Sequence, residues 1–230
     1  MRAVILQPGY LPWIGFFDLF ASCDVFVILD HVQYDKRSWR NRNRIRTNNE
    51  QGWQFITVPV LTKGKYNQSI VDTQVDNSRD WSSKHLKAIE LNYRGASHFG
   101  EYYPRFERIL TKKWVRLVDL DIEIIDFILE ELDIKTQYVR SSTFETSGKK
   151  IDLLIEICKK VKVDEYLNGD TGVKYLKSEK FESEGLKLVY HNYKHPVYDQ
   201  HFKGFVSHLS IIDLLFNHGR EGSKKVMNLS

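Results

Sequence analysis

An arginine-rich segment, residues 36–46 (KRSWRNRNRIR), carries the strongest chemical signal in the chain. It holds six basic side chains and no acid, with Arg40, Arg42, Arg44 and Arg46 at every second position. In an extended strand these four guanidinium groups would share one face, because side chains alternate with a period of two. Arginine makes planar, bidentate contacts with phosphate and carboxylate groups. The segment predicts a site for a polyanion, such as a nucleotide diphosphate or an acidic protein surface; a solvated edge hairpin protected by its charges is the alternative.

Short apolar runs near the start of the chain predict the elements that would position such a site. Residues 2–6 and 25–29 have the composition of buried strands, and residues 14–22 could make two helical turns between them. A strand, a helix and a strand in this order imply a parallel pair joined by a crossover. Residues 53–60 (WQFITVPV) alternate like a further strand that ends near Pro59. We therefore expect a mixed sheet.

The polar and aromatic segment 7–13 (QPGYLPW) leaves the first predicted strand. In α/β proteins, ligands bind at the carboxyl ends of parallel strands. Asp30 and His31 follow the second strand, so we expect segments 7–13 and 30–34 to share one cleft. Asp30 or His31 could then remove a proton as general base.

The middle of the chain has apolar residues at helical spacing. They predict helices over residues 78–93, 104–118, 121–132 and 149–160. In the last of these, Ile151, Leu154, Ile155 and Cys158 would form one buried stripe. We predict an α/β fold in a single domain over residues 1–230, with a mixed sheet, an N-terminal βαβ unit and a helical middle segment.

The last third of the chain returns to α/β signals. A glycine-rich turn at residues 168–172 (NGDTG) opens a helix predicted over residues 173–181. Such a turn can present backbone N–H groups to an anion, and the alternative is that Asp170 or Thr171 caps the helix. Ser210 is likewise placed to cap a C-terminal helix.

Two ionisable residues fall on the apolar faces of predicted helices. His85 shares a stripe with Trp81 and Ile89, so it could be a general base in a cleft or a satisfied core histidine. Asp213 lies within the run IIDLLF of a helix predicted over residues 211–218. A carboxylate buried there needs hydrogen-bonded partners, and it would serve either in the helix cap or in orienting a site residue.

Composition and charge limit the classes of function. The 230 residues are 42% hydrophobic and 28% charged, which is typical of a globular protein rather than a disordered one. A net charge of +4 argues against a general nucleic-acid binder. Cys23 and Cys158 form no CxxC pair and fit a reducing compartment. No apolar run approaches the ~20 residues that span a bilayer, and no secretory leader is visible, so we predict a soluble cytoplasmic protein.

The eight histidines predict no metal centre. His191 and His195 are four residues apart, but Pro196 disfavours helical geometry at His195, and no second pair of ligands lies nearby. The patterns GxGxxG, GxxxxGK[ST] and HExxH are absent. We therefore predict neither a metal nor a cofactor.

Five stretches of the chain together resemble the WbqC-like protein family. They are AVILQPGYLPWIGFFDLFASCDVFVILDHVQYDKRSWRNRNRI, WQFITVPV, DWSSKHLKAIELNY, YLNGDTG and FVSHLSIIDLLFNHG. The resemblance covers nearly the whole chain, and its opening blocks are the most specific part. One departure is Leu6, which stands before Gln-Pro where the resemblance leads us to expect a histidine in many relatives. The resemblance implies a role in bacterial polysaccharide and O-antigen biosynthesis.

This context and the residue chemistry favour a transferase that moves an acyl or aminoacyl group onto a nucleotide-linked amino sugar. The general base would be Asp30, His31 or His85. The donor could be an acidic acyl-carrier protein that docks on the arginines. The expected substrate-binding residues are Gln7, Tyr10, Trp13, Arg40, Asn41, Arg42, Arg44, Tyr198 and Gln200. The alternative function is a noncatalytic module that binds a glycan or a nucleotide sugar within a biosynthetic complex.

Overall fold

The computed structural model describes residues 1–169, 176 and 178–229. Contacts divide the chain into two compact units, each formed by three segments. The first unit contains Met1–Gln7, Gly15–Val32 and Ile134–Lys194, and the second contains Pro8–Ile14, Gln33–Asp133 and His195–Ser230. The single domain predicted over residues 1–230 stays a prediction.

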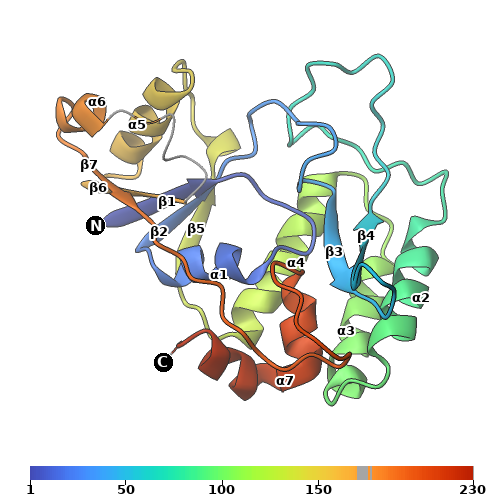
Figure 1. Cartoon of the computed structure of the whole chain (residues 1–230). Coiled ribbons are helices and arrows are strands. Elements are labelled where there is room, and N and C mark those ends of the chain that lie inside the picture. The colour runs from blue at the N-terminus through green and yellow to red at the C-terminus, as the bar shows by residue number, and fades with distance from the viewer. Residues whose placement is uncertain (170–175, 177, 230) are drawn as a thin grey trace. The chain divides into compact units, whose positions relative to one another are not determined.

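A parallel sheet organises the first unit (Figure 1). Its strand order is β5-β2-β1-β6-β7, and the strands are β1 Arg2–Leu6, β2 Val25–Ile28, β5 Gln137–Arg140, β6 Glu165–Asn168 and β7 Lys187–Tyr190. Helix α1 (Ile14–Ala21) connects β1 to β2, which confirms the predicted strand, helix and strand. Along the chain, β2 and then β5 are added on one side of β1, and β6 and then β7 are added on its other side, so the strand order reverses between β1 and β6. Sheets of this kind bind ligands beyond the carboxyl ends of their strands, near such a reversal.

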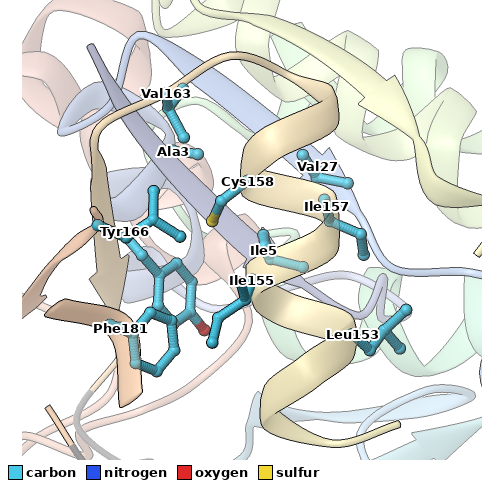
Figure 2. Packing of buried hydrophobic residues seen from close by; sticks show 11 residues of the cluster. Ala3, Ile5, Val27, Leu153, Ile155, Ile157, Cys158, Val163, Tyr166 and Phe181 are labelled. Atoms are coloured by element: carbon cyan, nitrogen blue, oxygen red, sulfur yellow. The ribbon is translucent and has the colours of Figure 1, made fainter. Parts of the chain in front are cut away.

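Helix α5 (Ile151–Lys160) supplies much of the core of this unit. Figure 2 shows Leu153, Ile155, Ile157 and Cys158 of this helix packed among side chains of β1, β2 and β6. Of the predicted buried stripe, Ile155 and Cys158 are in the core, whereas Ile151 and Leu154 are only partly buried and pack against it. The apolar face is wider than the predicted stripe, because Leu153 and Ile157 form a second row one helical turn apart.

The remaining short helices of the first unit flank these strands. The 3-10 helix η1 (Ser141–Thr143) follows β5 directly, and α6 (Ser178–Glu182) precedes β7. Of the glycine-rich turn, Asn168 ends β6 and Gly169 follows it. Residues 170–172, with the predicted caps at Asp170 and Thr171, lie outside the described residues.

Helices and one hairpin make up the second unit. They are α2 Trp81–Tyr93, α3 Phe99–Leu110, α4 Leu117–Glu131, α7 Ile211–Val226 and the antiparallel strands β3 Arg42–Arg46 and β4 Trp53–Thr57. The predicted α/β class and helical middle segment are thereby confirmed. The parallel and antiparallel strands lie in separate sheets.

The boundaries of α3 and α4 differ from the prediction. The helix predicted over residues 104–118 begins at Phe99 and ends at Leu110. Proline favours the first turn of a helix, but Pro104 lies further inside α3. A new helix begins at Leu117, whose N–H donates to the carbonyl oxygen of Thr73 at 2.9 Å.

Helix α7 begins at its predicted cap and continues beyond its predicted end. The hydroxyl of Ser210 accepts from the N–H of Ile212, which confirms the cap. Gly219 does not stop the helix; it has φ 63° and ψ −170° and joins two helical pieces at a kink. A Cβ atom there would lie 2.5 Å from Cε1 of His98. Glycine is therefore favoured both by the positive φ and by the close approach of the His98 ring.

Candidate functional site

The carboxyl edge of the parallel sheet gathers several polar side chains of the first unit. Gln7 follows β1 directly, and Asp30 and His31 come just after β2. The N–H of Leu29 donates to the carbonyl oxygen of Leu6 at 2.9 Å, so the parallel pairing extends to this edge. Because β5 pairs with β2, its continuation into η1 reaches the same edge.

Asp30 is a fully buried carboxylate held by several donors. The Nε of Arg140 donates to Oδ2 at 2.6 Å, and the N–H and hydroxyl of Ser142 donate to Oδ1 and Oδ2 at 2.8 and 2.9 Å. Charge-assisted bonds of this kind compensate the burial of a carboxylate and fix its orientation. Asp30 is therefore suited to orient its neighbours, whereas no side of it faces solvent to meet a substrate.

His31 is connected to Asp30 through the hydroxyl of Ser141. Oγ of Ser141 lies 3.1 Å from Oδ1 of Asp30, 3.0 Å from the N–H of Asp30 and 2.6 Å from Nδ1 of His31. The carboxylate only accepts, so the single hydroxyl proton of Ser141 goes to Asp30. The oxygen then accepts from Nδ1–H of His31. A neutral His31 is thus left with Nε2 as an acceptor, and Oγ1 of Thr146 lies 3.3 Å from it.

A second histidine at this edge was missed by the sequence analysis as a base. His191 follows β7, and its N–H donates to the carbonyl oxygen of Asn168 at 2.8 Å. Its Nε2 lies 2.6 Å from Oδ2 of Asp18 on α1, so the pair is an oriented imidazole and carboxylate. The position of His191 directly after the short apolar run of residues 186–190 (LKLVY) was the signal that could have found it. Within the described residues, no group of three or more His, Cys, Asp or Glu side chains is arranged to hold a metal ion.

The β3–β4 hairpin of the second unit presents a basic and aromatic face. Arg42 lies over the ring of Phe55 at 4.4 Å, and Arg44 lies over Trp53 at 4.9 Å and over Trp39 at 5.6 Å. Trp39 and Phe55 are exposed. The buried Nε atoms of Arg42 and Arg44 have no hydrogen-bond partner among the described residues. The predicted alternation holds here, because Asn41, Asn43 and Ile45 are buried and the intervening Arg42 and Arg44 are half-buried.

The outer two arginines of the predicted row of four turn inward. Arg46 is buried and donates to the carbonyl oxygens of Thr47, Gly52 and Lys203 at 2.7–2.9 Å. Arg40 lies outside β3 and donates to the carbonyl oxygen of Pro8 at 2.8 Å. Burial lowers the pKa of Arg40 to about 10. The spacing of four arginines could not distinguish surface guanidinium groups from ones that satisfy buried carbonyls.

His85 and Tyr10 form a closed pair in the core of the second unit. Nε2 of His85 lies 3.1 Å from the carbonyl oxygen of Thr57, which can only accept, so Nε2 carries the proton. Nδ1 then accepts from the hydroxyl of Tyr10 at 2.9 Å. Burial lowers the pKa of His85 to about 4, and Tyr10 is fully buried. Both ring nitrogens are engaged, which is the arrangement of a satisfied core histidine rather than of a base that titrates near neutrality.

Tyr198 and Gln200 converge on Asp213. The hydroxyl of Tyr198 and the amide of Gln200 donate to Oδ2 of Asp213, each at 2.9 Å, and Tyr93 donates to Oδ1 at 3.0 Å. The expectation that a carboxylate here needs hydrogen-bonded partners is confirmed. Burial raises the pKa of Asp213 to about 6, although the three donors favour its charged form.

Trp13, the remaining predicted binding residue, lies in an aromatic cluster. Its ring stacks on His208 and His195, with centroids 5.1 and 6.1 Å away. Arg44 donates to the carbonyl oxygen of His208 at 3.0 Å, which connects this cluster to the basic hairpin face. Trp13 and Arg44 are thus connected through His208. An aromatic ring near a guanidinium group is suited to bind a planar, charged ligand.

Comparison with known proteins identifies the family. A sequence model of the WbqC-like protein family matches residues 7–225. The chain belongs to the WbqC-like protein family. "Uncharacterized protein Rv1507c" of Mycobacterium tuberculosis (strain ATCC 25618 / H37Rv) is 37% identical over 222 residues, which are 96% of this chain and 95% of the relative. No solved structure matches this WbqC-like protein. The family is loosely linked to polysaccharide biosynthesis.

The two units of this WbqC-like protein offer different chemistry. The first has oriented imidazoles at the carboxyl edge of its sheet, which can accept and return protons. The second has a face of arginine and aromatic side chains, which can bind anions and planar groups. None of the described helices combines the length and apolar composition that a membrane crossing requires.

Proposed function

We propose that this WbqC-like protein is a cytoplasmic transferase of bacterial surface-polysaccharide (O-antigen) biosynthesis. It moves an acyl or aminoacyl group onto the amine of a nucleotide-linked amino sugar. The observation that carries the proposal is the orientation of His31, whose Nδ1 is fixed by Ser141 and Asp30 while Nε2 is an acceptor. A neutral imidazole held in this way is suited to general-base catalysis.

In the proposed reaction the sugar amine attacks the carbonyl carbon of an acyl thioester. Nε2 of His31 takes the amine proton, the carbon–sulfur bond breaks, and the proton passes to the departing thiolate. Asp30 and Ser141 act as positioning residues, because they contact His31 or each other. Gln7, at the same edge of the sheet, is a candidate to bind the sugar.

We assign substrate binding in the second unit to the hairpin face of Arg42 and Arg44 with Trp13. Its guanidinium groups and rings suit a nucleotide diphosphate or an acidic acyl-carrier protein. Tyr10, Arg40, Asn41, Tyr198 and Gln200 have structural contacts, so we give them a supporting role.

Turnover tests the proposal. The purified protein is incubated with acyl thioesters of a carrier protein and nucleotide-linked amino sugars, and both released thiol and N-acyl sugar are measured. The same sugars with the amine already acetylated serve as the matched control, because they keep every binding group except the nucleophile. Equal thiol release with both sugars would contradict amine acylation.

The alternative, a noncatalytic binding module, is favoured by one observation, the exposed rings of Trp39 and Phe55 beside the arginines. Aromatic rings can stack on sugars and bases without catalysing a reaction. Tight binding of nucleotide sugars in calorimetry, without turnover across the donor panel, would establish the module in place of the transferase.

A further inference from the structure

A threonine hydroxyl at the carboxyl edge of the first unit is placed to act as a nucleophile. Oγ1 of Thr146 lies 3.3 Å from Nε2 of His31. A nucleophile that is hydrogen-bonded to a base, with a third group orienting the base, is the signature of covalent catalysis. The distance between nucleophile and base is often long when no substrate is bound. Thr146 as a whole is half-buried, so part of the residue meets solvent.

The directions of the hydrogen bonds in this chain of contacts support the assignment. The hydroxyl of Ser141 donates to Asp30, and Nδ1 of His31 donates to Ser141, as derived above. The only role left to Nε2 of a neutral ring is to accept, so the Thr146 hydroxyl is the donor. The donors of these groups thus all point in one direction, from Thr146 through His31 and Ser141 to the buried carboxylate of Asp30.

The turn that carries Thr146 is fixed by its neighbours. The N–H groups of Ser147 and Gly148 donate to Oε2 of Glu156 on α5 at 3.1 and 2.9 Å. A Cβ atom on Gly148 would lie 2.8 Å from backbone atoms of Asp152 and Leu153, so the turn packs directly on the start of α5. These contacts position the hydroxyl beside the imidazole.

We propose that Thr146 is the catalytic nucleophile and carries the acyl group as an ester during transfer. In the first step Oγ1 attacks the thioester carbonyl, His31 takes the hydroxyl proton, and the thiolate leaves with that proton. In the second step the sugar amine attacks the ester, His31 takes the amine proton, and Oγ1 leaves and recovers it. This scheme rests on the proposed acyl transfer and replaces the direct attack of the amine on the thioester by two steps through a covalent intermediate.

A small activated ester tests the nucleophile without knowledge of the natural donor. The protein is treated with 4-nitrophenyl acetate, and acetylation is located by peptide mass spectrometry while nitrophenolate release is followed. We expect one acetyl group on Thr146. Thr146→Val and His31→Gln should lower the labelling at least tenfold, and Thr146→Ser should restore it. Thr143→Val is the matched control, because the Thr143 hydroxyl donates to the carbonyl oxygen of Arg140.

The outcomes separate this inference from the proposed function. Labelling that is absent from Thr146, or unchanged in His31→Gln, would overturn the nucleophile. Normal sugar acylation by Thr146→Val would also overturn it and leave direct transfer with His31 as base. Labelling of Thr146 without acylation of any amino sugar would support the nucleophile and refute the proposed acceptor.

Discussion

Two histidines, one in each unit, show how surroundings decide what the same side chain can do. His85 gives one nitrogen to a carbonyl and the other to a buried tyrosine, and burial lowers its pKa to about 4. His31 has one nitrogen fixed by a serine and the other beside the hydroxyl of a half-buried threonine. A base needs an oriented nitrogen whose partner can be exchanged for substrate, and of these two histidines it is His31 that has this combination.

The strongest test of this comparison is to replace each histidine by glutamine. His31→Gln should lower kcat about 10²–10⁴-fold, because it removes the group that accepts the proton. His85→Gln should leave kcat within a few-fold and instead lower the free energy of unfolding by about 1–3 kcal/mol, because it disturbs a buried hydrogen-bonded pair. Steady-state kinetics and urea unfolding of both variants give the result; equal losses of kcat would break the comparison.

Asp30→Asn tests the orientation of His31, because Asp30 acts on His31 through the hydroxyl of Ser141. The substitution removes the charge of a buried carboxylate that accepts from Arg140, so we expect a loss of about 3 kcal/mol of stability. It also weakens the acceptor that orients the Ser141 hydroxyl, so kcat should fall in the variant that remains folded. Asp24→Asn is the control, because that carboxylate is not part of the His31 network. Unchanged stability and kcat would remove Asp30 from its positioning role.

The pH dependence of stability extends the comparison to a second buried carboxyl. Asp213 has a pKa of about 6 in the folded protein against an ordinary value of 3.8, so the folded state binds its proton more tightly. Its contribution is therefore favourable at low pH and is lost as the pH rises from about 4 to about 6, by about 3 kcal/mol. Urea unfolding of Asp213→Asn across this range should show a flatter profile. A profile identical to that of the wild type would contradict the assignment.

A smaller effect is expected from Tyr10→Phe. The change removes the hydroxyl that donates to Nδ1 of His85 and should cost about 1–2 kcal/mol of stability, because the nitrogen stays buried without a donor. The pKa of His85, followed by NMR, should stay low, since burial is its largest cause. A return of this pKa to near 6.5 would show that the tyrosine, rather than burial, keeps the ring neutral.

An equally small effect on stability is expected at the basic hairpin. Replacing Arg42 and Arg44 together by alanine should cost about 1–2 kcal/mol, the sum of two exposed cation–π contacts. Calorimetry with nucleotide sugars and with an acidic carrier protein should show weaker binding by the double variant. The affinity of the wild type should fall as salt is added, because salt screens the charges. The exposed Arg79, which pairs with Asp76, gives a control substitution to alanine. Unchanged affinity for both ligands would leave the hairpin as a protected edge.

The sequence was informative wherever a local period determined the structure. The alternation at residues 41–45 correctly predicted which side of β3 is buried, and the apolar runs around α1 correctly predicted a parallel pair. Long-range partners could not be predicted in this way. Nothing near Asp30 in the chain indicates that Ser141 and Ser142 will bind it, because those residues arrive with β5 more than a hundred positions later. The pairing of His191 with Asp18 could not be predicted for the same reason, since the two residues are 173 positions apart.

The pairing of β1 with β6 also has a consequence for synthesis on the ribosome. β1 can join β2 soon after both emerge, and the β3–β4 hairpin closes over a short loop. The backbone groups on the other side of β1 have no strand to pair with until β6 is made, because Arg2 pairs with Glu165. Through most of translation β1 is therefore an open edge of the kind that recruits other unpaired strands. A nascent chain stalled before residue 165 should need chaperone protection, and release of that protection should coincide with the appearance of β6.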